Sequence, residues 1–391
     1  MRGARFARMA VPTTPGPAAA RVVGSLVDEI EGEIDAIVEG IGERMREEIP
    51  DFRRVPAESI SQRVRGNILR ALAALRELRA PTDEELELPA AVGRERADQG
   101  LTVDAVLHAY RITVTAIWSR FGDLARQRGA DVASVLAFSE TLWVWADAVM
   151  DVAAASHREV ELEHAREEQQ RRDAFVIAVL LGTLDAADLA REGATFGLDP
   201  EREYTPFRAR AAADGAPAHR LAMSLAGEDG MATGLDRDVA GIAARTPSEQ
   251  PRVVIGVGPA ARLEALPAAF GMASRALQTA LAFGQEGAFS LADLSIRPAI
   301  LADEALGDAF ATRYLTPLAD LGRLGADLES TLQTWFDQGM RIEDTARALH
   351  IHPNTLRHRL RRFEEATGAT LREPRHLVEL WWALERRRLA G

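Results

Sequence analysis

Apolar side chains in the first part of the chain recur at three- and four-residue spacing, which is the period of one helix face. The clearest run extends from Val103 to Trp118 and is preceded by Thr102, a residue type that often caps the start of a helix. A second apolar segment, LWVWADAVM at 142–150, has the composition of a core helix. No strand-like alternation interrupts this region, so the pattern predicts an all-helical domain over residues 17–160.

Polar residues take over at 155–172, a segment that contains neither glycine nor proline. The pattern predicts an exposed helix that continues into the apolar run 174–184, and we assign residues 161–190 as a connecting helix. A dimeric coiled coil is an alternative for this segment, although its apolar residues follow the heptad period poorly.

Glycine and proline become more frequent after residue 190, and the apolar segments become shorter. A helix is expected at 266–283, and GEDG at 227–230 has the composition of a hairpin turn. Residues 191–300 are therefore predicted to form a small α/β domain. Three segments are predicted as strands: 204–213, 219–226 and 252–258.

Helical periodicity returns after residue 305, and residues 320–391 are predicted to form a third domain. Two short helices are expected on either side of the tripeptide 350–352. Pro353 stands at the first position of the second helix, which proline tolerates. A small residue, Ala346, would let the two helices cross closely, and Ile351 would fill the turn. This is the outline of a helix-turn-helix.

The second of these helices, expected at 353–366, divides into two faces at about 100° per residue. Apolar residues fall on one face and complete a predicted packing set: Ala346, Leu349, Ile351, Leu356, Leu360 and Phe363. Polar residues form the opposite stripe, which we predict to contact DNA: His352, Asn354, Thr355, Arg357, His358, Arg361 and Arg362. Asparagine and arginine pair with the edges of adenine and guanine, whereas threonine and flanking arginines hold phosphates.

The distribution of charge supports this interpretation. All 47 basic residues are arginine, and the formal net charge of the chain is −12. Residues 326–391 hold 11 Arg against 10 acidic residues, a net +1, and within them residues 341–363 hold 6 Arg against 2 acidic residues, a net +4. A local positive patch on an acidic protein is the electrostatic footprint of a nucleic-acid contact.

Composition also excludes several classes of protein. The chain contains no cysteine, so it forms no disulfide and no thiolate zinc site. No apolar run reaches the ~18–20 residues of a membrane span, so we expect no membrane association. Residues 1–16 are basic and rich in proline and glycine, and a disordered tail is expected there, with a targeting peptide as the alternative.

The C-terminal residues resemble the helix-turn-helix of the PucR/CdaR class of bacterial transcription regulators, whose pattern is A-x-x-L-x-x-H-x-N-T-x-x-Y-R-L. The matching positions are Ala346, Leu349, His352, Asn354, Thr355, Arg359 and Leu360. Thr367–Gly368 and residues 374–384 are similar to the closing segment of the family. His358 stands where the family usually has tyrosine, and Pro353 where it usually has arginine, so the resemblance implies no particular target sequence.

Two further segments resemble domains that accompany this helix-turn-helix. Residues 272–281 look like the closing helix of a degenerate GGDEF-like domain, and residues 93–111 resemble part of the RsbRD-type helical sensor domain. The latter domain is globin-like in related stress regulators and needs no haem. His108 is therefore not expected to bind haem, and the resemblance implies no cofactor.

The resulting prediction is a multidomain, mostly α protein with an all-α N-terminal sensor domain, a small α/β (GGDEF-like) middle domain and a C-terminal helix-turn-helix. It is predicted to be a cytoplasmic bacterial transcription regulator and not an enzyme. A homodimer or higher homo-oligomer would read a two-part site in double-stranded DNA with the helix at 353–366. A small-molecule effector or a signalling protein would act through the N-terminal or middle domain.

Other functions remain as alternatives. A stress-signalling scaffold would act by protein–protein contact through the N-terminal domain. A nucleotidyl cyclase would need paired carboxylates for two Mg²⁺ ions, for which Glu228 and Asp229 are the candidates, but they lack the Gly-Gly-acid-acid-Phe order. Gly256 and Gly258 form a GxG without a third glycine, which is a weak nucleotide signal. The histidines at 350, 352 and 358 lack a fourth ligand at sensible spacing, so we expect no metal.

Overall fold

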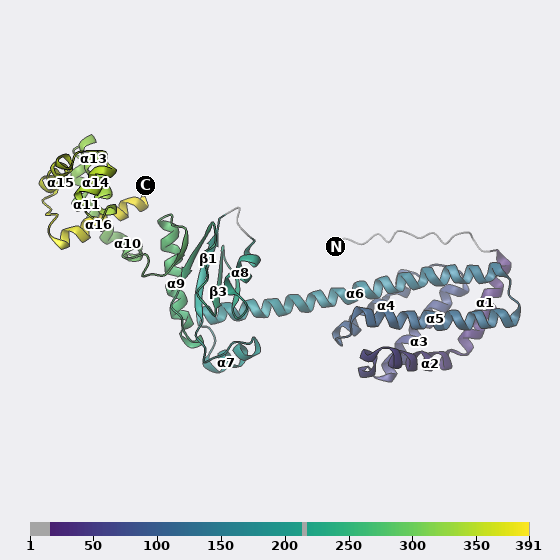
Figure 1. Cartoon of the computed structure of the whole chain (residues 1–391). Helices are drawn as coiled ribbons and strands as arrows, with labels where there is room; N and C mark the ends of the chain where they lie inside the picture. Colours follow the sequence, from purple (N-terminus) through teal and green to yellow (C-terminus); the bar gives the residue numbers. More distant parts are fainter. Residues whose placement is uncertain (1–15, 213–216, 391) are drawn as a thin grey trace. The chain divides into compact units, whose positions relative to one another are not determined.

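The computed structural model of the chain describes residues 16–212 and 217–390. The predicted tail at 1–16 therefore lies outside the described residues, apart from its last position. The chain divides into two compact units, residues 1–169 and 170–391, and the division falls inside a single long helix (Figure 1). The fold is multidomain and mostly helical, as predicted.

The first unit is a helical bundle, which confirms the all-helical prediction for this region. Its core includes the stacked rings of Phe121 and Phe138, whose centroids lie 3.5 Å apart. The Thr102 hydroxyl accepts a hydrogen bond from the Ala105 amide at 3.2 Å, so the predicted N-cap is present. The elements are α1 Pro17–Gly32, α2 Ile34–Glu48, the 3₁₀ helix η1 Pro50–Arg54, α3 Ala57–Arg76, α4 Asp83–Asp98, α5 Val103–Arg128 and the first part of α6 Val132–Leu181.

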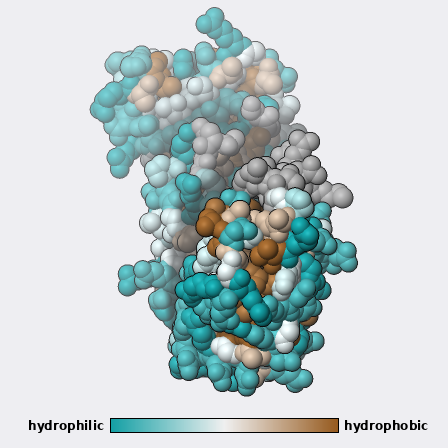
Figure 2. Space-filling view, turned by 90° about the vertical axis from the view of Figure 1, so that its right-hand side faces the viewer, coloured by the Kyte–Doolittle hydropathy of each residue, from teal (hydrophilic) through white to brown (hydrophobic). Residues whose placement is uncertain are grey.

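Helix α6 changes character along its length. Its beginning supplies core residues such as Trp145 and Val149, whereas residues 161–172 are exposed throughout, as the polar composition predicted. Among the described residues it is the one helix long and apolar enough to cross a membrane, a test that a core helix of a soluble protein also passes. Figure 2 shows a face of the first unit that is mainly hydrophilic and interrupted by hydrophobic patches.

The second unit begins with the end of α6 and contains a five-stranded sheet in the order β2-β3-β1-β4-β5. The central strand β1 runs antiparallel to both neighbours, with Phe207 opposite Gly241 on β3 and Val257 on β4. Strand β5 pairs parallel with β4. The elements are α7 Ala186–Thr195, β1 Thr205–Ala211, α8 Ala218–Ala226, β2 Met231–Leu235, β3 Asp238–Ala243, β4 Val253–Val257, the 3₁₀ helix η2 Leu263–Ala265, α9 Leu266–Ala282 and β5 Gly287–Phe289.

Helices cover both faces of this sheet. Phe175 of α6 and Phe270 of α9 share a core with Ile242 of β3, whereas Leu221 of α8 packs with Phe207 of β1. Gly256 and Gly258 have a packing role, because a Cβ at these positions would lie 2.0 Å and 2.2 Å from carbonyl oxygens of α9. Their spacing therefore reflects a close strand–helix approach.

One predicted strand is wrong. Residues 219–226 lie in helix α8, which buries Leu221 and Leu225 at helical spacing against the sheet. A short apolar run does not by itself distinguish a strand from a helix, and here tertiary packing decides. GEDG consequently joins a helix to β2, and the hairpin lies one step later, between β2 and β3 at Asp236 (φ 56°). Strands β2, β3 and β5 were not predicted.

The C-terminal helices form a separate core of the second unit. Phe363, Leu380 and Trp335 are buried there together with Tyr314, so this core begins upstream of the predicted domain start at 320. The elements are α10 Arg297–Ala302, α11 Glu304–Tyr314, α12 Thr316–Ala319, α13 Arg323–Asp337, α14 Ile342–Ala348, α15 Pro353–Thr367 and α16 Pro374–Ala390.

Candidate nucleic-acid interface

The turn between α14 and α15 has a defined backbone geometry. The Ile351 amide donates to the Ala346 carbonyl at 2.9 Å, which closes the last turn of α14. His350 occupies the left-handed region with φ 53°, a position more often taken by glycine. Ala346 is 2% exposed, as expected where two helices cross closely. The chain then enters α15 at Pro353.

The apolar side of α15 lies in the C-terminal core. Leu356 and Phe363 are fully buried, and Leu360 is 9% exposed. Leu349 and Ile351 are half-buried against the same core. The predicted packing set is therefore brought together around α14, the turn and α15.

The polar side of α15 faces solvent. All seven residues predicted to contact DNA are exposed. Two pairs are joined along the helix, because Arg357 Nη1 donates to Asn354 Oδ1 at 2.9 Å and Arg361 Nη2 lies 3.1 Å from His358 Nδ1. The stripe thus presents donors and acceptors to solvent, and four of its residues form two separate pairs.

His352 has a structural role at the start of α15. Its Nδ1 accepts a hydrogen bond from the Asn354 amide at 3.2 Å, which satisfies one of the unpaired amides at the helix start. The ring stays exposed. His352 therefore serves as an N-cap, and only its Nε2 side can face a ligand in this arrangement.

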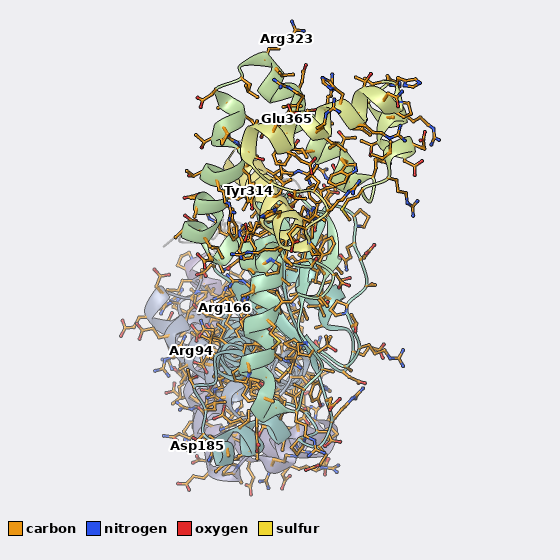
Figure 3. All side chains as sticks on the ribbon, turned by 90° about the vertical axis from the view of Figure 1, so that its left-hand side faces the viewer. Arg94, Arg166, Asp185, Tyr314, Arg323 and Glu365 are labelled. Atoms are coloured by element: carbon orange, nitrogen blue, oxygen red, sulfur yellow. The ribbon has the colours of Figure 1, made fainter. Side chains whose placement is uncertain are left out.

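The arginines of the stripe have acidic neighbours at varying distances. Arg362 pairs with Glu365 at 2.9 Å, whereas Arg361 lies 3.8 Å from Glu365 and Arg357 lies 3.8 Å from Glu343. Figure 3 shows the side chains of these helices, with Glu365 labelled on α15. Exposed ion pairs of this kind contribute roughly 0–1 kcal/mol, so phosphates can replace the carboxylates at little cost.

Sequence reasoning missed the side chains that hold α15 in place. Arg359 Nη1 donates to the Thr331 hydroxyl on α13 at 3.0 Å, and Glu364 Oε1 accepts from the Leu371 amide at 2.8 Å. A signal for Arg359 existed, because at 100° per residue it falls beside Leu356 and Leu360 on the packing face. No sequence signal identified the bond to Leu371.

The residues of the alternative functions lie elsewhere. Asp229 pairs with Arg202 at 3.2 Å, and both line a surface cavity of about 420 Å³ with Glu228. His108 is half-buried, and its Nε2 lies 3.4 Å from Glu48 Oε2. Within residues 16–212 and 217–390, no group of three or more histidine, aspartate or glutamate side chains is arranged to hold a metal.

Two segments match known protein families. Residues 35–172 match the RsbT co-antagonist protein rsbRD N-terminal domain, and residues 328–385 match the PucR C-terminal helix-turn-helix domain. The first match covers helices of the bundle, and the second covers most of α13 together with α14, α15 and most of α16.

Individual relatives are similar over short stretches. An uncharacterised protein of Mycobacterium tuberculosis is 40% identical over 77 residues, which is 20% of this chain and 18% of that protein. The carbohydrate diacid regulator of Escherichia coli is 39% identical over 74 residues, 18% of this chain and 19% of the regulator. A crystal structure of a regulator of polyketide synthase expression from Bifidobacterium adolescentis aligns with 55% of this chain and 97% of its own, at 20% identity and a TM-score of 0.26. The matches to the first two span about a fifth of those relatives' length.

Proposed function

We propose, from the premise that the chain is a regulator of the PucR/CdaR type, that it is a sequence-specific DNA-binding transcription regulator whose recognition helix is α15. The observation that supports this proposal best is the division of α15. Leu356 and Phe363 fix the helix in the core, while the seven polar residues of the stripe stay exposed on the opposite side. A helix held in this way can enter a major groove with its N-terminal half.

Within this proposal the protein is cytoplasmic, acts as a homodimer or higher homo-oligomer and reads a two-part site in double-stranded DNA. A small-molecule effector or signalling protein would act on the N-terminal bundle or on the middle domain, which we continue to interpret as GGDEF-like. The matched domains belong to regulators, which supports a role without catalysis. The acidic remainder of the chain would discourage other surfaces from binding phosphates.

Fluorescence anisotropy of the full-length protein tests this proposal. The labelled fragments are DNA upstream of the coding sequence and a scrambled duplex of the same length and composition. We expect tighter binding to the upstream fragment and a linear fall of log K with log salt concentration, because counterions are released from phosphates. Equal affinity for both fragments, or affinity independent of salt, would contradict the proposal.

A second candidate function is a stress-signalling scaffold, which the match of residues 35–172 to the rsbRD N-terminal domain favours. Such a protein would bind signalling proteins through the bundle and would not need α15. Pull-down of kinase or sigma-control partners by a chain that binds neither DNA fragment would support the scaffold over the regulator.

A further inference from the structure

Helix α6 carries a row of large apolar side chains that the bundle leaves exposed. Val132, Leu136 and Trp143 are 74%, 55% and 54% exposed. At 100° per residue these three positions fall within about 40° of one another, so they lie along one edge of the helix. Single exposed apolar residues are common on protein surfaces, but a row that includes a tryptophan is typical of an interaction surface.

A surface groove of about 500 Å³ borders this apolar row, between α5 and the start of α6. Its lining includes Trp118 and Val135, which are both half-buried. Gly122 also lines it, and a Cβ there would meet no listed atom within 4 Å, so the groove is open at this point. Since pockets of roughly 300–1,000 Å³ hold drug-sized molecules, the groove has room for an indole ring.

The groove and the exposed tryptophan are spaced so that the surface can complement a copy of itself. Val135 in the groove and Trp143 are eight residues apart, or about 12 Å along α6. A two-fold axis near Ser139, midway between them, would place Trp143 of each copy at the groove of the other. Ser139 is small and half-buried, so two helices can approach closely there. A two-fold contact uses the same patch on both copies, and this patch supplies both halves.

Charge favours the same arrangement. Glu140 and Asp147 flank Trp143 at one turn on either side, and both are exposed without an ion pair or hydrogen bond among the residues that the structure describes. Helix α6 has no Arg or Lys between Val132 and His157, so these carboxylates have no cation nearby on their own helix. The groove carries Arg126, which is 79% exposed. Insertion of Trp143 into the groove of a second copy would bring the carboxylates toward that arginine.

We propose that two copies of the chain associate through this surface, with Trp143 of each copy packed in the α5–α6 groove of the other. The apolar residues supply the affinity, whereas the exposed charges mainly fix the register, so Arg126→Ala should leave the dimer intact. The inference rests on the homodimer of the proposed function and names its surface. It places the contact on the bundle and not on the exposed segment 161–172, for which a coiled coil is the alternative.

Sedimentation equilibrium of the full-length protein without DNA, over a range of protein concentrations, tests this inference. We expect a monomer–dimer equilibrium for the wild type. Trp143→Ala should raise the dimer Kd at least roughly tenfold, because a tryptophan buried in a pocket is a typical interface anchor and the two-fold contact loses it twice. The side chain is half exposed in the single chain, so its removal leaves the core of the bundle in place.

Two further variants locate the contact. Gly122→Leu fills the groove and should also raise the dimer Kd at least roughly tenfold, while the free space at Gly122 and the higher helix propensity of leucine preserve α5. The control is Leu162→Ala, which removes a side chain of α6 that is 56% exposed and lies in the segment 161–172. It should change the dimer Kd by no more than about twofold.

A wild type that stays monomeric at every concentration would overturn the inference. A dimer Kd that Trp143→Ala leaves unchanged would do so as well, even if Gly122→Leu failed to fold. A loss in Leu162→Ala as large as that in Trp143→Ala would assign the contact to the coiled-coil alternative. Because these measurements contain no DNA, their failure is distinguishable from failure of the proposed DNA binding, which the anisotropy experiment measures on its own.

Discussion

Arg361 on α15 leaves 66% of its side chain exposed, whereas Arg96 in α4 leaves 2%. Arg361 lies near a histidine and a glutamate of its own helix, at 3.1 Å and 3.8 Å. Arg96 bonds to Glu95 and Gln99 inside the bundle and lies 5.8 Å from the Phe52 ring centroid. The same residue type is thus a replaceable surface contact in one region and part of a core in the other.

This difference teaches where a charge can act on a partner. An exposed arginine can contact a long polyanion such as DNA, because the guanidinium group is already at the surface and its present ion pairs are weak. A buried arginine acts only on something small enough to enter the bundle, but it acts there with little screening. Net charge alone does not separate these two cases.

The largest expected difference between the regions is in stability. Arg96→Ala should lower the free energy of unfolding by about 2–4 kcal/mol, because it enlarges a cavity and removes buried hydrogen bonds. Arg361→Ala should change it by no more than about 0.5 kcal/mol. Urea unfolding of both full-length variants measures this. Equal destabilisation by the two substitutions would remove the basis of the comparison.

For DNA affinity, the larger effect is expected from substitutions on α15. Asn354→Ala combined with Arg361→Ala should weaken specific binding by about 1–3 kcal/mol, or roughly 5–150-fold, for each base pair read, with a smaller effect on scrambled DNA. Arg126→Ala, which removes an arginine of the first unit that is 79% exposed, is the control. Fluorescence anisotropy should show no change for the control. A loss as large in Arg126→Ala would show that total charge, and not α15, determines binding.

The contributions of two carboxylates to stability should depend differently on pH. Arg79 donates to Glu85 at 2.7 Å and holds the pKa of Glu85 down to about 2, and Glu85 also completes the cap of α4 with Thr82. A lowered pKa stabilises the fold above the ordinary pKa of about 4.5, and this contribution disappears as pH falls toward 2. Glu85→Ala should therefore cost about 1–2 kcal/mol at pH 7 and progressively less below pH 4.5.

The matched carboxylate is Glu365, which pairs with Arg362 on the surface of α15. Glu365→Ala should alter stability by no more than about 0.5 kcal/mol at any of these pH values. Denaturation curves between pH 7 and pH 3 measure both variants. A pH-independent cost of Glu85→Ala would show that the ion pair adds nothing to the cap.

The smallest expected effect distinguishes two arginines of α15 itself. Arg362→Ala should reduce the slope of log K against log salt by about 0.9, since one phosphate contact is lost, with similar weakening on all sequences. Arg359→Ala should leave this slope unchanged and instead reduce stability by about 1 kcal/mol, because it loses the bond to Thr331. Salt titrations of both variants measure these slopes. A reduced slope for Arg359→Ala would show that Arg359 contacts a phosphate and is not only a packing residue.

The helical elements were predictable because their burial follows a single period. The run from Val103 to Trp118 and the faces of α15 both depend on one-sided packing, which the sequence pattern records. Helix α8 was missed because eight residues fit a strand or a helix equally well, and contact with β2 and β3 decides between them. Strands β2 and β3 contain small residues such as Ala232 and Gly241, which give little alternation to read.

Two features of the molecule differ in the same way. The polar stripe was predictable as an exposed face, because six of its seven residues lie within α15, where side chains project at known angles, and the seventh, His352, is the N-cap; its contact with DNA is a proposal. The buried surroundings of Arg96 were not, because η1 and helices α2 to α5 contribute to them from separate parts of the chain. A sequence pattern marks exposed arginines readily, but it does not show which arginine a bundle will enclose.

The most direct test of the central claim, that α15 reads DNA, is a genome-wide occupancy measurement for the wild-type protein and the Asn354→Ala/Arg361→Ala variant. The account predicts discrete sites that share a two-part sequence in the wild type and that are lost in the variant at equal protein level. Uniform occupancy without a shared sequence, or sites that the variant retains unchanged, would contradict it.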